Sequence, residues 1–142
     1  MEQVTYTATR SHEWDSGHRV YGHQGKCQRL HGHRYEATFI CTAEALDALS
    51  MVIDFSVIKE RLCVWIDQEW DHRCLLFNED PLLAVVGEAD KSVVGVPFNP
   101  TAEAIAGYLL MTVGPTQLKG TGVTLVKVIV NETRKCAAEA SL

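Results

Sequence analysis

Two segments with period-two alternation constrain the fold more than any other feature of the sequence. Val4–His12 and Gly32–Thr42 contain many β-branched residues and alternate apolar with polar side chains, which is typical of half-buried strands. The apolar face is Val4, Tyr6 and Ala8 in the first segment, and Tyr35, Ala37, Phe39 and Cys41 in the second. We predict that the two form a long antiparallel pair. Between them, Asp15–Leu30 contains three glycines and is expected to be a structured loop of the kind that carries function.

Helical periodicity follows in the middle of the chain. Asp54 is suited to cap a helix that runs to about Trp70, because apolar residues recur after it at helical spacing. Asn99-Pro100 predicts a second N-terminus, with Asn99 as the cap, and Gly114-Pro115 is expected to end that helix. One further helical turn is expected in Leu82–Val86.

The remaining strand signals complete the predicted sheet. Val123–Thr133 has β-branched residues on both faces and predicts a well-covered strand, with a last strand near Val93–Phe98 or near Cys136–Ala140. We therefore predict an α+β fold, an antiparallel four-stranded sheet with two helices on one face. One domain spanning residues 1–142 fits this length. The other face of the sheet would be bare in a monomer, so we also expect a closed homo-oligomer.

Composition excludes several classes of protein. Hydrophobic residues make up 46% and charged residues 22% of the chain, as in soluble globular proteins, and the apolar stretches are far shorter than the ~20 residues that cross a bilayer. The net charge of -5 disfavours nucleic acid as a partner. The first residues contain no apolar signal region, so a cytoplasmic location is expected. Of the five cysteines, all except Cys27 are expected to be buried free thiols.

A cluster of histidines is the strongest functional signal. Five of the six histidines precede Arg34, and His31 and His33 are separated by one residue at the start of a predicted strand. Because residues i and i+2 of a strand share a face, both imidazoles point to the same side. A third histidine would complete the three-histidine arrangement that suits catalytic zinc with an open position. Spacing alone leaves three candidates for it, which are His12, His18 and His23.

Cys27 lies four residues before His31 and has two opposed interpretations. It is either a fourth ligand of a closed structural site or a thiol beside an open one. The stretch from Ser16 to Tyr35 has no acidic residue and contains four basic ones, Arg19, Lys26, Arg29 and Arg34. Cationic surroundings favour the thiolate and hence the second interpretation. In a chain of negative net charge, they also indicate an anionic small-molecule substrate, for which polyphosphate is the natural candidate.

Two further features carry weaker signals. Asp71 precedes His72, and a carboxylate beside an imidazole can orient it and raise its basicity. Glu132 ends a strand of Val, Ile and Thr, where a carboxylate is costly unless hydrogen-bond donors meet it. A guanidine-like edge of a ligand would provide two such donors.

These motifs together resemble a known enzyme family, the 6-pyruvoyl-tetrahydropterin and 6-carboxy-tetrahydropterin synthases. The resemblance covers nearly the whole chain and rests on Gly17-His18-Arg19, Cys27-Gln28-Arg29-Leu30-His31-Gly32-His33, Asp71-His72, Asn99-Pro100-Thr101-Ala102-Glu103 and Val130-Asn131-Glu132-Thr133. It implies the tunnelling fold, in which sheets join into a barrel in a trimer or hexamer, with active sites between subunits. It also implies zinc on His18, His31 and His33, Cys27 as proton acceptor, Asp71 and His72 as a proton relay, and Glu132, helped by Thr101, as the anchor of the pterin.

The spacing between Cys27 and His31 points to one branch of this family. Three residues separate them, as in the bacterial carboxy-tetrahydropterin synthases of the 7-deazaguanine (queuosine) pathway. The resemblance thus implies conversion of 7,8-dihydroneopterin triphosphate to 6-carboxy-5,6,7,8-tetrahydropterin, with loss of acetaldehyde and triphosphate and without a redox cofactor. Two alternatives stay open, which are 6-pyruvoyl-tetrahydropterin synthesis and a non-enzymatic zinc-stabilised interaction module.

Overall fold

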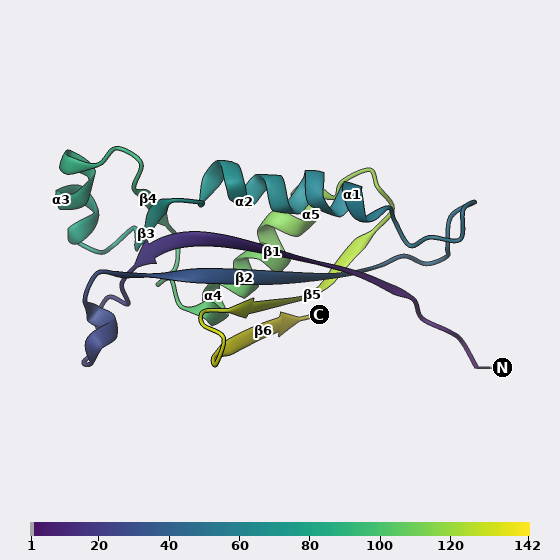
Figure 1. Ribbon diagram of the computed structural model, residues 1–142, viewed down its shortest axis with the longest axis horizontal. Helices are drawn as coiled ribbons and strands as arrows, with labels where there is room; N and C mark the ends of the chain where they lie inside the picture. Colours follow the sequence, from purple (N-terminus) through teal and green to yellow (C-terminus); the bar gives the residue numbers. More distant parts are fainter. Residues whose placement is uncertain (1) are drawn as a thin grey trace.

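Six strands form one sheet with the main helices packed against one face (Figure 1). The computed structural model describes residues 2–142. The strand order is β4-β3-β1-β2-β5-β6. The strands are β1 Thr7–His18, β2 His31–Thr42, β3 Arg73–Phe77, β4 Val94–Val96, β5 Thr124–Asn131 and β6 Ala137–Ser141.

The β1–β2 pair confirms the predicted antiparallel pairing but has other limits. β1 begins three residues later than predicted and continues to His18, so the loop between the strands starts only at Arg19. The reason is that Trp14, Ser16 and His18 continue the inward alternation and are buried. In the resulting register His18 lies opposite His31. The first four residues of the predicted loop, Asp15–His18, are therefore strand, and they carry a histidine to the end of the sheet.

The prediction of a four-stranded antiparallel sheet is wrong. Both candidate last strands form, as β4 and β6, and β3 was not predicted at all. β3 runs parallel to β1 and β4 runs parallel to β3, so the sheet is mixed. β3 and β4 have only five and three residues, too few for an alternation to be recognised. Parallel pairing of such short strands depends on distant parts of the chain.

The first predicted helix is confirmed. Asp54 accepts a hydrogen bond from the Ser56 N–H (2.8 Å) and caps α1, Phe55–Ile58. The helix continues through a π-helical turn, Lys59–Cys63, into α2, Val64–Glu69. The single turn expected after it is a longer helix, α3, Leu82–Ala89.

The second predicted helix forms with different ends. Its cap is Thr101 and not Asn99, because the Thr101 hydroxyl accepts the N–H of Ala104 (3.1 Å) at the start of α4, Ala102–Tyr108. A π-helical turn, Leu109–Val113, leads into α5, Gly114–Gln117. The expected stop at Gly114-Pro115 is therefore wrong. Wide π turns accommodate groups that interrupt the hydrogen-bond ladder, and this one ends two residues before Pro115.

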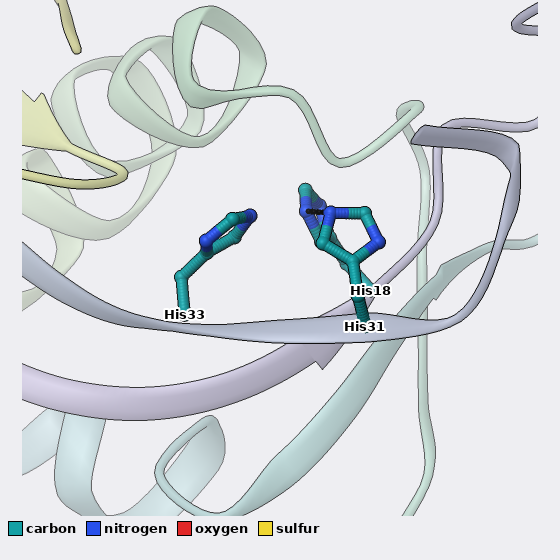
Figure 2. A group of neighbouring side chains, drawn as sticks. All are labelled: His18, His31 and His33. Atoms are coloured by element: carbon teal, nitrogen blue, oxygen red, sulfur yellow. Dashed lines mark hydrogen bonds between the residues drawn. The ribbon is translucent and has the colours of Figure 1, made fainter. Parts of the chain in front are cut away.

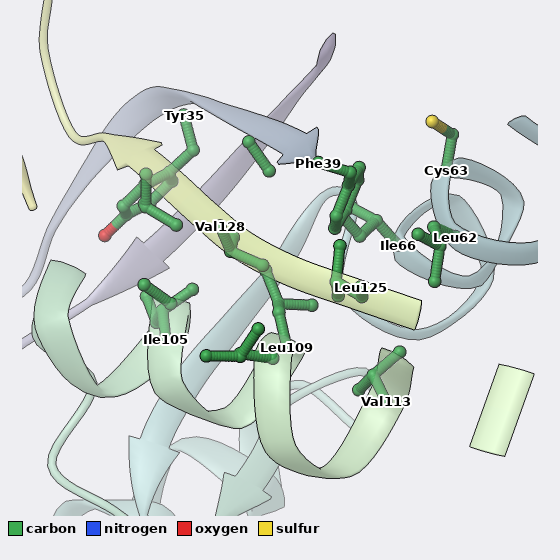
Figure 3. Close-up of a cluster of buried hydrophobic side chains, with 14 of the residues drawn as sticks. Tyr35, Phe39, Leu62, Cys63, Ile66, Ile105, Leu109, Val113, Leu125 and Val128 are labelled. Carbon is green, nitrogen blue, oxygen red and sulfur yellow. The ribbon is translucent and has the colours of Figure 1, made fainter. Parts of the chain in front are cut away.

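The hydrophobic core lies between the helices and the inner face of the sheet (Figure 3). Figure 3 shows Tyr35 and Phe39 of β2 and Val128 of β5 facing Ile105 and Leu109 of the second helix. On the outer face, by contrast, β1 exposes a row of polar residues, which are Thr7, Thr9, Ser11 and Glu13. This strand therefore offers no apolar surface to a neighbouring copy, and the oligomer itself stays a prediction.

The five cysteines are free thiols, but their burial differs from the prediction. Cys41 and Cys63 are buried, and burial raises the pKa of each thiol to about 11. Cys74 is half-buried and Cys136 is exposed, so the expectation of burial is wrong for Cys136. None of the helices in residues 2–142 has the length and apolar character needed to cross a bilayer.

Candidate metal centre and its surroundings

Three histidines converge where β1 ends and β2 begins (Figure 2). The ring centroids of His18 and His31 are 4.6 Å apart, and His33 lies 5.1 Å from the first and 4.8 Å from the second. One nitrogen of each ring lies within 4.8 Å of the others. The register of the hairpin places His18 opposite His31, and alternation along β2 places His33 on the same face.

Backbone carbonyls determine which ring nitrogens of two of the histidines are free. The His18 Nδ1 lies 2.7 Å from the Pro100 carbonyl oxygen, and the His31 Nδ1 lies 2.6 Å from that of Arg29. Since a carbonyl only accepts, each Nδ1 carries a hydrogen, and in a neutral ring the Nε2 presents its lone pair. Carbonyl partners of this kind fix the tautomer of metal-ligating histidines.

The two free nitrogens face each other. The His18 and His31 Nε2 atoms are 3.2 Å apart. A hydrogen bond between them would require one ring to be protonated on both nitrogens, and burial lowers the pKa of His18 and so opposes that charge. Two lone pairs at this distance repel each other unless a cation lies between them. The donor set thus fits Zn²⁺, which prefers neutral imidazole nitrogens.

His33 adds a third nitrogen without a hydrogen bond. Its Nε2 is buried and has no hydrogen-bond partner within residues 2–142. Glu132 Oε1 lies 3.1 Å away, but the contact lacks hydrogen-bond geometry. Burial also lowers the pKa of His33 and favours the neutral ring. Glu132, immediately after β5, thus lies beside the predicted ligands, although its carboxylate is not among the ligand atoms that converge with the three histidines.

Cys27 lies outside this group of possible ligands. It is half-buried on a 3-10 turn, Lys26–Gln28, and its carbonyl accepts the Val20 N–H (2.7 Å). Its thiol is not among the atoms that converge with the three histidines. This placement disfavours the interpretation of Cys27 as a fourth ligand.

The positive charge expected around Cys27 is smaller than the sequence suggests. Arg19 forms a two-pronged ion pair with Asp80, and Arg34 pairs with Asp15 (2.9 Å) and Glu13 (3.4 Å). These carboxylates come from other parts of the fold, so the lack of acidic residues in the local sequence does not leave the cations unpaired. Lys26 and Arg29 form no ion pair within residues 2–142 and remain the cations available to an anion.

Asp71 and His72 do not converge with the three histidines but group with Asp15, although His72 and His33 line one cavity of this chain. The Asp71 carboxylate accepts the Asp15 N–H (3.0 Å) and lies 3.0 Å from the His72 Nδ1. Partial burial by itself would raise the pKa of Asp71, but these two donors outweigh it and the pKa is lowered. His72 has φ 61° and its side chain is 76% exposed. The pair therefore presents an oriented imidazole to the outside of this chain.

Several residues near the histidines were not identified from the sequence. Pro100 orients His18 through its carbonyl, next to Thr101, which the family resemblance had already implied and which caps α4. Tyr35 is buried edge-on to His18 and His33, with centroid distances of 5.8 and 5.5 Å, and its hydroxyl has no partner within residues 2–142. Continuation of the i, i+2 pattern from His33 would have identified Tyr35. A backbone carbonyl leaves no signal in the sequence.

A cavity beside this cluster is large enough for a small organic ligand. Its volume is ≈ 660 Å³, within the usual range for ligand sites. His33 and Glu132 lie in its wall together with Arg34, Asn131 and Arg134. One predicted metal ligand, His33, and the predicted anchoring carboxylate of Glu132 thus border the same space.

Comparisons with known proteins agree with these features. The family model described as 6-pyruvoyl tetrahydropterin synthase matches residues 7–141. A Rickettsia felis protein named 6-carboxy-5,6,7,8-tetrahydropterin synthase is 38% identical over 133 residues, which is 92% of this chain and 96% of the relative. A Haemophilus influenzae protein of the same name is 30% identical over 111 residues, covering 73% of this chain and 79% of the relative.

Solved structures show the same fold. An uncharacterized protein from Wolinella succinogenes superimposes with a TM-score of 0.86 at 23% identity, covering 98% of this chain and 99% of the other. The 6-pyruvoyl tetrahydropterin synthase of Caenorhabditis elegans gives a TM-score of 0.72 at 21% identity, covering 100% and 99%. Given the family match over residues 7–141 and the close relatives along most of its length, the chain belongs to the 6-pyruvoyl tetrahydropterin synthase family of enzymes.

Proposed function

We propose that this protein is a zinc-dependent 6-carboxy-tetrahydropterin synthase. It would convert 7,8-dihydroneopterin triphosphate and one water molecule to 6-carboxy-5,6,7,8-tetrahydropterin, acetaldehyde and triphosphate, in the cytoplasm and for 7-deazaguanine (queuosine) biosynthesis. The names of the Rickettsia felis and Haemophilus influenzae relatives support the carboxy product. The spacing of Cys27 and His31 supports the same branch.

One observation carries the proposal, which is the convergence of His18, His31 and His33 with two Nε2 lone pairs facing each other at 3.2 Å. When bound there, Zn²⁺ would supply Lewis acidity to side-chain oxygens of the substrate. The three histidines would hold it, and the Pro100 and Arg29 carbonyls would keep two of them in the ligating tautomer.

The other residues have roles in proton transfer and substrate binding. Cys27 would remove a proton from the carbon next to these oxygens, and His72, oriented by Asp71, would return one. Glu132, in the wall of the cavity, would accept the ring N–H and the amino group of the pterin with its two oxygens. Thr101 would assist in substrate binding through its hydroxyl hydrogen, since its oxygen already accepts from Ala104. No redox cofactor is needed, because the side chain of the substrate supplies the electrons for the ring.

A homo-oligomer would complete this site. Asp71 and His72 do not belong to the three-histidine group of their own chain, and His72 is exposed and so accessible to a neighbouring copy. In a trimer or hexamer, a neighbouring copy would bring its own pair to the zinc. A single domain over residues 1–142 would be the repeating unit, and its partners would be the pterin triphosphate and further copies of itself.

Two alternatives compete with this proposal. In 6-pyruvoyl-tetrahydropterin synthesis the same substrate would keep all its side-chain carbons, so the mass of the product separates the two reactions. In a non-enzymatic zinc module Cys27 would be a ligand, and its position outside the three-histidine group counts against that arrangement.

The test combines metal analysis with product analysis of the same samples. His33→Ala should lose zinc and turnover together, because only two of the three predicted zinc ligands remain. His23→Ala is the control, since His23 is exposed and contacts the Gly25 N–H (2.8 Å) away from the cluster. Wild-type protein given dihydroneopterin triphosphate should release 6-carboxy-tetrahydropterin, detected by mass spectrometry. Full zinc retention in His33→Ala, or a pyruvoyl product, would overturn the corresponding part of the proposal.

A further inference from the structure

Asn99 holds the loop that carries Cys27. Its side-chain Oδ1 accepts the Tyr21 N–H (2.9 Å), and its Nδ2 donates to the Tyr21 carbonyl (2.8 Å). Both backbone polar groups of one loop residue are thus satisfied by a single side chain, although 78 positions separate the two in sequence. Asn99 was predicted as a helix cap, but Thr101 fills that role, so its side chain is free for this contact.

The same short segment also orients a metal ligand. Pro100 follows Asn99 directly, and its carbonyl receives the His18 Nδ1–H at 2.7 Å. Two consecutive residues therefore contact the three-histidine cluster and the loop. This coupling aligns the loop with the cluster independently of the hairpin.

A second contact anchors the loop just before Tyr21. The Arg19 guanidinium binds Asp80 through two nitrogens and lies over the Tyr21 ring, 5.7 Å from its centroid. Between these anchored residues, the Val20 N–H donates to the Cys27 carbonyl at 2.7 Å. The backbone of Cys27 is therefore bound to a residue that is fixed on both sides.

We propose that Asn99 is a positioning residue that fixes the loop of Cys27 relative to the three-histidine cluster by clamping the backbone of Tyr21. The inference rests on the proposed function only for the role of Cys27 as proton acceptor. Asn99 acts through Tyr21, Val20 and Cys27 and does not touch the substrate, so its loss affects the chemical step and not substrate binding. A displacement of about 1 Å in a catalytic group can cost a hundredfold in rate.

The test uses two variants of Asn99 and one control. Asn99→Ala removes both hydrogen bonds, whereas Asn99→Asp keeps the acceptor for the Tyr21 N–H and loses only the donor. Asn78→Ala is the matched control, because the Asn78 side chain is exposed and makes no hydrogen bond within residues 2–142. In zinc-loaded protein we measure zinc content, kcat, KM and the rate of Cys27 alkylation by iodoacetamide. The exposed thiol of Cys136 serves as internal reference.

We expect Asn99→Ala to keep its zinc and its KM, to lose about 10- to 100-fold in kcat, and to show a several-fold higher ratio of Cys27 to Cys136 alkylation. Asn99→Asp should lie between Asn99→Ala and the wild type, and Asn78→Ala should match the wild type. An unchanged alkylation ratio in Asn99→Ala would overturn the proposal. Loss of zinc would overturn it as well, because Asn99 would then act on His18 through Pro100.

Failure of the proposed function is distinguishable from failure of this inference. If wild-type protein does not turn over dihydroneopterin triphosphate, the proposed function fails, while the alkylation ratio still reports whether Asn99 holds the Cys27 loop. If turnover is normal and the ratio does not respond to Asn99→Ala, only the positioning role fails.

Discussion

Asp80 is expected to contribute to stability far more than a surface carboxylate does. Its side chain is 1% exposed, and its two oxygens accept from the Arg19 guanidinium and from the Leu82 N–H (2.8 Å). Asp80→Asn preserves the shape, removes the charge and places an amide N–H against the donors of Arg19. Breaking a buried ion pair by removing one partner costs about 3–5 kcal/mol. Arg19 is 22% exposed, so water solvates part of the remaining charge, and we expect about 2–3 kcal/mol.

Urea unfolding of zinc-loaded protein at fixed protein concentration measures this loss, with the fluorescence of the buried Trp14 and Trp70 as the signal. In a chain of this length, each kcal/mol of lost stability lowers Tm by about 2–4 °C, so the Tm of Asp80→Asn should fall by about 4–12 °C. Asp67→Asn is the matched control, because Asp67 is 49% exposed and pairs with His12 near the surface. The control should lose less than about 1 kcal/mol.

The pH dependence gives an independent check on the same carboxylate. Hydrogen bonds from Arg19 hold the pKa of Asp80 below its ordinary value. A carboxyl group with a depressed pKa stabilises the folded state above its unfolded pKa of about 3.9, and this stabilisation is lost as the pH falls through the folded pKa. The difference in the free energy of unfolding between wild type and Asp80→Asn should therefore be constant at neutral pH and shrink in acid. If Asp80→Asn loses no more unfolding free energy at pH 7 than Asp67→Asn does, the reasoning is refuted.

Three further predictions concern the site and its support. Cys27→Ala should retain zinc and lose about 100-fold or more in rate, as measured by metal analysis and steady-state kinetics, and zinc loss would identify Cys27 as a ligand. Glu132→Gln should weaken the binding of a non-reacting pterin by about 1–3 kcal/mol, because a hydrogen-bond donor would replace an acceptor. Calorimetry measures this affinity, and an unchanged value would contradict the prediction. Ser16→Ala should cost about 1–3 kcal/mol in urea unfolding, because the Trp14 Nε1–H, now 3.0 Å from the Ser16 hydroxyl, would be buried without a partner.

Local periodicity was sufficient to predict much of the fold. The apolar face of β2 and the capped helix after Asp54 were predicted from residues that are neighbours in sequence. Such patterns are informative because each strand or helix buries one face, and burial repeats with the period of the element. The ends of the strands and helices were less predictable. β1 continues to His18 because Trp14 and Ser16 are buried, and their burial depends on packing against distant parts of the chain.

The directions of the short strands depended on tertiary structure. β3 and β4 pair parallel to their neighbours, and their sequences are too short to carry a period. Likewise, Asn99 has the residue type of a helix cap, but its side chain binds Tyr21 in a distant loop instead. Pairings between segments far apart in sequence leave no local signal, because their free energy comes from contacts that form only in the folded chain.

The metal centre shows the same division. The sequence alone placed His31 and His33 on one face of a strand, because that relation is local, and the family resemblance pointed to His18. Only the register of β1 against β2 brings His18 to within 3.2 Å of His31. Only the tertiary structure supplies the Pro100 carbonyl that sets the His18 tautomer and the Asp80 carboxylate that neutralises Arg19. Residue types and their spacing thus determined which groups were available for chemistry, while packing between distant segments decided their protonation, charge and orientation.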